Sequence, residues 1–144
     1  MYTGFLHLHD TLRWLLLLSL VTTLVKYLIG WFGNQRWKKT DNLMGIVFTS
    51  IMDVQLLVGL VLYFFLSPIT KLALNDFGVA MKNADLRFYA VEHIAMMLIA
   101  VALVHIGRAK SKKATSDLAK FRIATIFYFL ALVIIMAAIP CGRI

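Results

Sequence analysis

Cysteine, proline and acidic residues are scarce in this sequence. Its 144 residues include one cysteine, Cys141, and two prolines, Pro68 and Pro140. One cysteine excludes an intrachain disulfide, and without a CxxCH motif covalent attachment of a c-type haem is excluded as well. Phosphate-binding loops, HExxH motifs and nucleophile–base arrangements are also missing, so the sequence predicts no catalytic residues.

Acidic residues are outnumbered by basic ones, with seven Asp and Glu against fifteen Lys and Arg, for a net charge of +8. A basic protein could bind nucleic acid, but the sequence contains no RNP motif or zinc-finger spacing. The basic residues instead gather in two short stretches between apolar runs, as in membrane proteins. We therefore predict that they face a lipid bilayer and that nucleic acid is not a partner.

Apolar residues dominate what remains: 61% of the chain is hydrophobic and the mean hydropathy is +0.82. A soluble domain of this size could not bury so much apolar surface. We therefore expect an integral membrane protein with a single domain over residues 1–144. The first apolar segment lacks a preceding basic region and is long enough to span, so we interpret it as a retained helix and not as a signal peptide.

Four apolar segments approach the roughly 20 residues that a spanning helix needs. They predict an all-α, four-helix transmembrane bundle, and Pro68 and Pro140 follow the second and fourth segments, where a helix is expected to have ended. Lysine and arginine are enriched in the loops over residues 31–42 and 108–120, which places both loops in the cytoplasm and both termini on the outer, periplasmic side. Within the remaining loop, Leu72–Met81 is half apolar and predicts a short interfacial helix. The four predicted spans are residues 8–30, 43–66, 86–107 and 121–139.

Ionisable residues inside these spans are the strongest functional signal, because they are costly in lipid. At 1.5 Å per residue, His93 lies roughly 9 Å from the outer end of the third span and Asp53 roughly 15 Å into the second. Asp53 is therefore expected deep and apart from the outer cluster, and His105, at the cytoplasmic end, is expected to be an interface or hydrogen-bonding residue. An outer-leaflet cluster is predicted from the remaining residues, namely His7, His9, Asp10, Arg13, Glu92 and His93.

Two histidines on facing helices are the usual ligands of a b-type haem. His93 is the best candidate, with His9 or His7 opposite it, and an arginine such as Arg13 or Arg87 is suited to pair with the propionates. A stripe of small and apolar residues continues from His93 along the third span and could accept either a flat ring or a close helix. Its members are Tyr89, His93, Met96, Ala100, Val104 and Gly107.

Other interpretations of these residues stay open. A metal ion could be bound by His7, His9, Glu92 and His93. Glu92 and His93 could instead cross-link helices, or Asp10 could form an ion pair with Arg13. Gln55 is a further polar residue inside a predicted span, on a different face from Asp53 and near Gly59. A proton path through Asp53 and Glu92 is a further alternative.

Four segments of the chain resemble a family of small four-helix inner-membrane proteins of Gram-negative bacteria that carry the label cytochrome b. The segments are LHLHDTLRW (residues 6–14), DVQLLVGLVLYF (53–64), RFYAVEHIAMM (87–97) and HIGRAKSKKA (105–114). The resemblance implies a haem b protein of the bacterial inner membrane, with His9 and His93 as ligands and His7 and His105 as lesser candidates. At Asp53 the chain departs from the family, in which histidine is common, and aspartate is a poor axial ligand.

Together these observations predict a membrane protein of electron transfer, with haem b held between the first and third helices near the outer leaflet. An electron carrier or accessory subunit is favoured over a stand-alone catalyst. The alternative is a cofactor-free subunit or scaffold of a larger complex, in which the buried polar residues determine helix packing. The expected partners are the bilayer, other membrane or respiratory subunits, and a second copy of the chain.

Overall fold

The computed structural model describes residues 2–66, 71–72 and 75–139. Pro68, Pro140 and Cys141 lie outside these residues, as does part of the predicted interfacial helix over Leu72–Met81. The long helices are α1 (Tyr2–Phe32), α2 (Lys39–Val61), α6 (His93–Lys113) and α7 (Asp117–Ala138). Shorter helical elements are η1 (Leu62–Leu66), α4 (Phe77–Lys82), α5 (Ala84–Arg87) and η2 (Phe88–Glu92).

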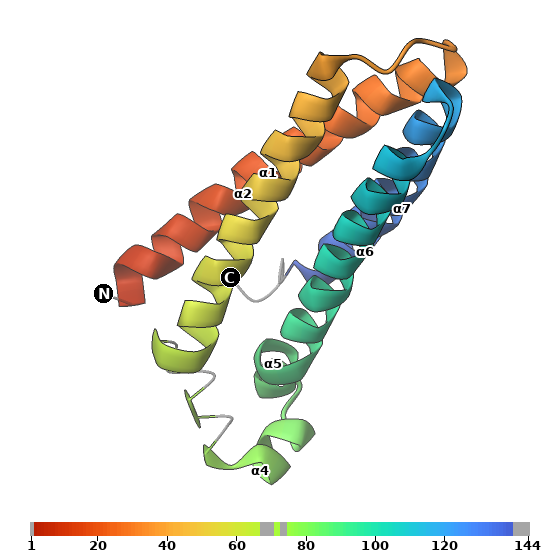
Figure 1. Ribbon diagram of the computed structural model, residues 1–144. Helices are drawn as coiled ribbons and strands as arrows, with labels where there is room; N and C mark the ends of the chain where they lie inside the picture. Colours follow the sequence, from red (N-terminus) through yellow and green to blue (C-terminus); the bar gives the residue numbers. More distant parts are fainter. Residues whose placement is uncertain (1, 67–70, 73–74, 140–144) are drawn as a thin grey trace.

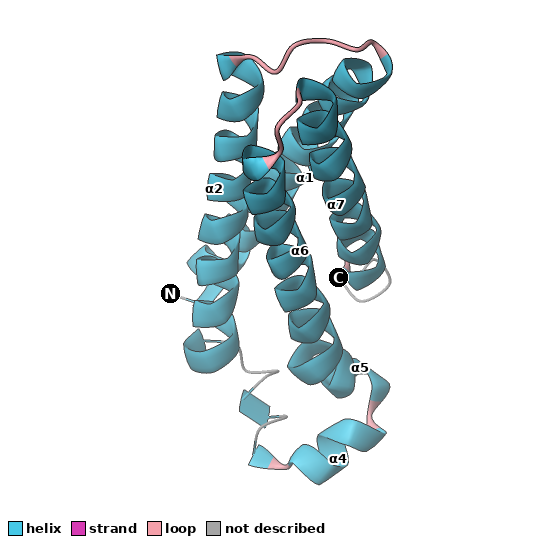
Figure 2. Ribbon diagram, turned by 45° about the vertical axis from the view of Figure 1, so that its right-hand side comes forward, coloured by secondary structure: helices cyan, strands magenta, loops and turns pink. Residues whose placement is uncertain are grey.

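All described secondary structure is helical, as the apolar pattern predicts (Figure 2). Within the described residues, four helices are long and apolar enough to cross a membrane, namely Tyr2–Phe32, Lys39–Phe65, His93–Lys113 and Asp117–Ala138. This suggests a multi-pass membrane protein and is consistent with the predicted helical bundle. The four helices overlap the four predicted spans, but the first begins earlier, at Tyr2, and the third continues to Lys113.

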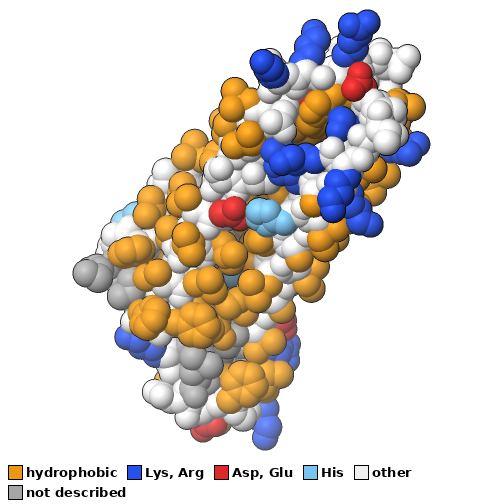
Figure 3. All heavy atoms as spheres, in the orientation of Figure 1, with side chains coloured by type: hydrophobic (Ala, Val, Ile, Leu, Met, Phe, Trp, Pro, Cys, Tyr) orange, Lys and Arg blue, Asp and Glu red, His pale blue; other side chains and the backbone are white. Residues whose placement is uncertain are grey.

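The helices form a bundle in which α1 lies between α2 and α7, and α6 packs mainly against α7. In Figure 1, α1 is inclined relative to α2, and the α1–α2 and α6–α7 connections lie at the same end of the bundle. We call this the basic end, because lysines and arginines gather there (Figure 3). The start of α1, the end of α2 and the elements α4, α5 and η2 lie towards the opposite end, which we call the histidine end.

At the basic end, local hydrogen bonds stabilise the end of α1 and the start of α2. Asn34 has a positive φ of 51°, and the Gln35 N–H donates to the Gly30 carbonyl at 2.9 Å, an arrangement that satisfies the last carbonyls of α1. The buried Asp41 carboxylate then accepts from the Lys38 N–H at 2.9 Å and pairs with Lys26 at 2.9 Å. These contacts bind the start of α2 to the end of α1.

Close packing continues into the core through an aromatic cluster. The ring of Tyr27 lies 5.9 Å from that of Phe121 and 5.9 Å from that of Tyr128, between ring centres. The ring centres of Phe48 and Tyr128 are 5.1 Å apart. Aromatic pairs at these separations add to the apolar burial and connect α1, α2 and α7. The basic end is therefore held by packing and hydrogen bonds together.

Candidate functional site

His9 and His93 meet at the histidine end of the bundle. His9 belongs to α1 and His93 is the first residue of α6. Their ring centres are 6.4 Å apart and the ring planes make an angle of 57°. α1 begins at Tyr2, earlier than predicted, and is inclined relative to α2 (Figure 1), and its His9 ring meets that of His93 at the start of α6.

The π-helical element η2 determines where His93 points. The His93 N–H donates to the Phe88 carbonyl, five residues earlier, instead of to the residue four before it. Such π-turns change the phase of a helix and often occur at functional sites. The His93 Nδ1 lies 2.8 Å from the Ala138 carbonyl oxygen. Because a carbonyl only accepts hydrogen bonds, Nδ1 carries the proton and Nε2 keeps its lone pair.

His9 is positioned by two residues of α2. Gln55 donates from Nε2 to the His9 carbonyl oxygen at 2.8 Å. Gly59 lies beside the ring, and a Cβ atom on Gly59 would be 3.4 Å from His9 Nε2. A larger side chain at position 59 would therefore occupy the space next to this nitrogen. This hydrogen bond joins α2 to α1, a role that was not predicted for Gln55.

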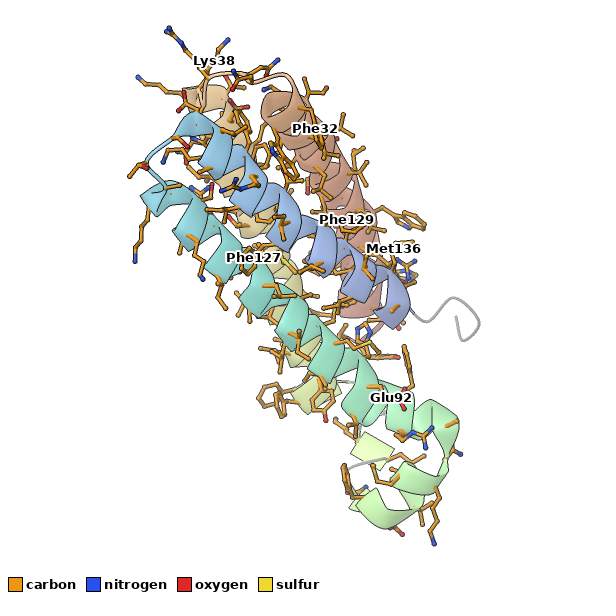
Figure 4. The ribbon with its side chains drawn as sticks, turned by 90° about the vertical axis from the view of Figure 1, so that its right-hand side faces the viewer. Phe32, Lys38, Glu92, Phe127, Phe129 and Met136 are labelled. Carbon is orange, nitrogen blue, oxygen red and sulfur yellow. The ribbon has the colours of Figure 1, made fainter. Side chains whose placement is uncertain are left out.

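The charged residues near His9 and His93 have other partners than the predicted outer-leaflet cluster implies. Glu92 pairs with Arg87 at 2.7 Å, so Arg87 is already neutralised. Arg13 has no carboxylate partner within the described residues: its guanidinium lies 5.0 Å from the Trp14 ring centre, and its buried Nε makes no hydrogen bond. The alternative of an ion pair between Asp10 and Arg13 is therefore wrong. Figure 4 shows Glu92 near α5, at the histidine end.

Two other predicted features take no part in this arrangement. His7 is exposed, and the described residues contain no group of three or more His, Cys, Asp or Glu side chains that could hold a metal ion. The metal site predicted from His7, His9, Glu92 and His93 is therefore wrong. On α6, Ala100, Val104 and Gly107 are buried, and Gly107 contacts Phe127 of α7 (Figure 4). This part of the stripe receives a close helix, one of the two predicted alternatives.

Asp53 and His105 form a second polar site, on α2 and α6. Asp53 Oδ1 and His105 Nε2 are 2.7 Å apart, and the two side chains are 48% and 47% exposed. His105 is therefore a hydrogen-bonding residue, one of its two predicted roles, and Asp53 still lies apart from the His9–His93 pair. The contact between Asp53 and His105 was not predicted. The helices extend beyond the predicted spans, to Lys39 and Lys113, so both residues lie further from the basic end than expected. The sequence feature that could have predicted this pair is the presence of one acidic residue and one histidine, Asp53 and His105, on two different predicted spans.

The geometry of His9 and His93 can be compared with that of two ligands on one metal. A metal–imidazole nitrogen bond is about 2 Å, and the ring centre lies about 1 Å beyond the nitrogen, so two opposite imidazoles have centres about 6 Å apart. The observed 6.4 Å agrees with this spacing. Each ring plane then contains the ligand–metal axis, so any angle between the planes is compatible, including 57°.

Comparisons with known protein families, with curated proteins and with solved structures found no match for this chain. The two polar sites, His9–His93 and Asp53–His105, are therefore the features that indicate its chemistry.

Proposed function

We propose that this chain is a membrane protein of electron transfer that binds haem b between α1 and α6. The observation that carries the proposal is the pair of imidazole rings from His9 and His93, 6.4 Å apart. A haem needs only two protein ligands because its porphyrin supplies four nitrogens, so the lack of a larger ligand cluster in the described residues is compatible with it. Bound haem would supply a one-electron redox centre.

The residues around the two histidines fit such a group. The hydrogen bond from His93 Nδ1 to the Ala138 carbonyl is the support that metal-binding histidines usually have, since it orients the ring and leaves Nε2 available. Gly59 leaves room beside His9 Nε2. The buried, unpartnered Nε of Arg13 could receive a propionate carboxylate, whereas Arg87 is occupied by Glu92.

The orientation in the membrane follows from the basic loops. The positive-inside rule places the basic end in the cytoplasm, and the histidine end then lies in the outer leaflet with both termini outside. Because the resemblance in the sequence is to bacterial inner-membrane proteins, we assign the chain to that membrane. Electron partners would therefore approach from the outer side or from within the bilayer.

The test is the optical spectrum of the full chain, purified in mild detergent after expression with added haem. A pyridine haemochrome assay should find about one haem b per chain, with a low-spin ferric spectrum typical of two imidazole ligands. His93→Ala and His9→Ala should each remove most of the Soret absorbance. His7→Ala, a matched control on the same helix, should retain it because His7 is exposed. A chain without any Soret band would overturn the proposal.

A cofactor-free scaffold is the second candidate, and the interhelical hydrogen bonds favour it. Gln55 joins α2 to α1, and His93 joins α6 to the end of α7. In that case the chain should purify together with a partner subunit in mild detergent. A monodisperse, haem-free chain without a partner would count against the scaffold, and a stoichiometric haem would favour electron transfer.

A further inference from the structure

The Asp53–His105 pair lies on the outside of the bundle, with Asp53 midway along its helix and His105 near the end of the apolar part of α6, three residues before Arg108. Asp53 is near the centre of the 27-residue helical segment Lys39–Phe65, and His105 is near the centre of the 21-residue α6. In Figure 3 an acidic side chain adjoins a histidine on a largely apolar face. The neighbouring side chains that point outward include the apolar Val54, Leu57 and Ile106, and also the exposed Ser50. In the proposed membrane orientation, this position is open to molecules dissolved in the bilayer.

Helix packing alone does not account for this pair. Ionisable residues inside membranes almost always face the bundle interior or a water-filled cavity, because exposure to lipid is costly. Here both side chains are about half exposed, at 48% and 47%. Their mutual hydrogen bond uses Asp53 Oδ1 and His105 Nε2. Within the described residues, Asp53 Oδ2 and His105 Nδ1 have no hydrogen-bond partner, so the pair can still bind a polar group.

The free atoms suit a headgroup that alternates between hydroxyl and carbonyl. A carboxylate oxygen accepts a hydrogen bond from a hydroxyl group. An imidazole nitrogen can donate to a carbonyl or accept from a hydroxyl, depending on its protonation. A sterol or glycerol hydroxyl would use only part of this capacity. A quinone and its reduced hydroquinone use both functions, and their isoprenoid tails dissolve in the bilayer.

The position on α2 points to the same class of ligand. Gly59, which lies beside the His9 ring, is six residues from Asp53, or about 9 Å along the helix axis. A headgroup at Asp53 would thus lie about 9 Å along the axis of α2 from the level of Gly59, on a different face of the helix. We propose that Asp53 and His105 form a binding site for the headgroup of a lipid-soluble quinone. The choice of a redox-active ligand rests on the proposed haem function, whereas binding itself does not require haem.

The experiment uses the full chain in lipid nanodiscs and an azido-quinone with an isoprenoid tail as a photoaffinity probe. Mass spectrometry should find the label on the segments of α2 and α6 that flank Asp53 and His105, and an excess of unlabelled quinone should compete. Asp53→Asn, His105→Gln and the double variant should each lower labelling at least tenfold. As matched polar changes on the lipid-facing side of α7, Val133→Asn and Met136→Gln should leave it unchanged, because both side chains are exposed elsewhere.

Two further measurements keep the result interpretable. Circular dichroism and the elution volume in detergent should match the unmodified chain for every variant, which separates lost binding from lost folding. The haem-free His93→Ala variant is labelled in parallel. Labelling of both the unmodified chain and His93→Ala at α2 and α6 supports the quinone site even if the haem proposal fails.

Other outcomes overturn the inference. A chain that contains haem but takes no label on α2 or α6 would exclude the quinone site and leave the haem proposal intact. Labelling that persists in the double variant would show that the pair does not form the site. A second copy could also cover this face, with Asp53 of each copy opposite the partner's His105. Efficient disulfide crosslinking through Val54→Cys, without labelling, would assign the face to such a dimer.

Discussion

At the scale of single residues, small side chains are as important as ligands at the histidine end. Gly59 contributes no functional group, but it faces His9 Nε2, and a Cβ there would already approach this nitrogen to 3.4 Å. His93 is oriented by a backbone carbonyl, that of Ala138. Neither contact involves a residue type that is chemically reactive, yet each determines what the imidazoles can bind.

The role of Gly59 can be tested by changing its size. Gly59→Ala should retain most of the haem, because its Cβ makes a near-ordinary contact, whereas Gly59→Leu should lower the haem content per chain at least tenfold by filling the space beside His9. Haemochrome absorbance per mole of protein measures this. Gly4→Leu, on the same end of α1 with nothing within 4 Å of its Cβ position, is the matched control. Equal haem in Gly59→Leu and Gly4→Leu would contradict the assignment.

At the scale of elements, close contact between α6 and α7 sets the shape of the bundle. Gly107 packs directly against the ring and Cβ of Phe127, so the two backbones approach one another as in small-residue contacts of membrane helices. Figure 4 shows Phe127 on the side of α7 that faces α6, whereas Phe129 and Met136 point away from α6. The π-turn η2 then changes the phase at the start of α6 and directs His93 inward.

Gly107→Ala should disturb this contact, because its Cβ would overlap Phe127. We expect the free energy of unfolding to fall by about 1–3 kcal/mol, as in other overpacked cores. Denaturant titrations in detergent micelles, followed by circular dichroism, measure the change. In a Phe127→Gly background the same substitution should cost much less, since both the Cβ atom and the ring that it would overlap are absent. An equal loss of unfolding free energy in both backgrounds would show that Phe127 is not the residue that Gly107→Ala overlaps.

At the scale of the whole molecule, charge is distributed unevenly along the bundle. The α1–α2 and α6–α7 connections lie at one end (Figure 1), and these connections together with the adjoining helix ends carry most of the lysines and arginines (Figure 3). The histidine pair lies towards the other end. At the basic end, the ion pair between Lys26 and Asp41 joins α1 to α2. This asymmetry is what orients a protein in a membrane, because basic loops remain on the cytoplasmic side.

The orientation can be measured with single cysteines, since the chain has one natural cysteine that Cys141→Ser removes. Arg36→Cys and Lys112→Cys at the basic end should react with a membrane-impermeant maleimide only after the cytoplasmic side is opened. Phe77→Cys, which is exposed on α4, should react in intact cells from the outer side. Labelling with the reverse pattern would invert the topology and move the histidine pair to the cytoplasmic leaflet.

The sequence by itself determined the class of the protein: a chain of apolar segments, with basic loops, that forms four helices able to span a membrane. Hydropathy and loop charge are local properties of the sequence, and the transfer of an apolar segment into lipid has a large free energy. Errors of several residues in the ends of the predicted spans therefore do not change that conclusion. His93 was also recognisable as a buried imidazole. Only the tertiary structure decided that His9 and not His7 lies beside it, that His105 pairs with Asp53, and that Gly59 and Gly107 face neighbouring side chains. Such pairings depend on helix tilt, start and phase, and each residue of error turns a side chain by about 100°.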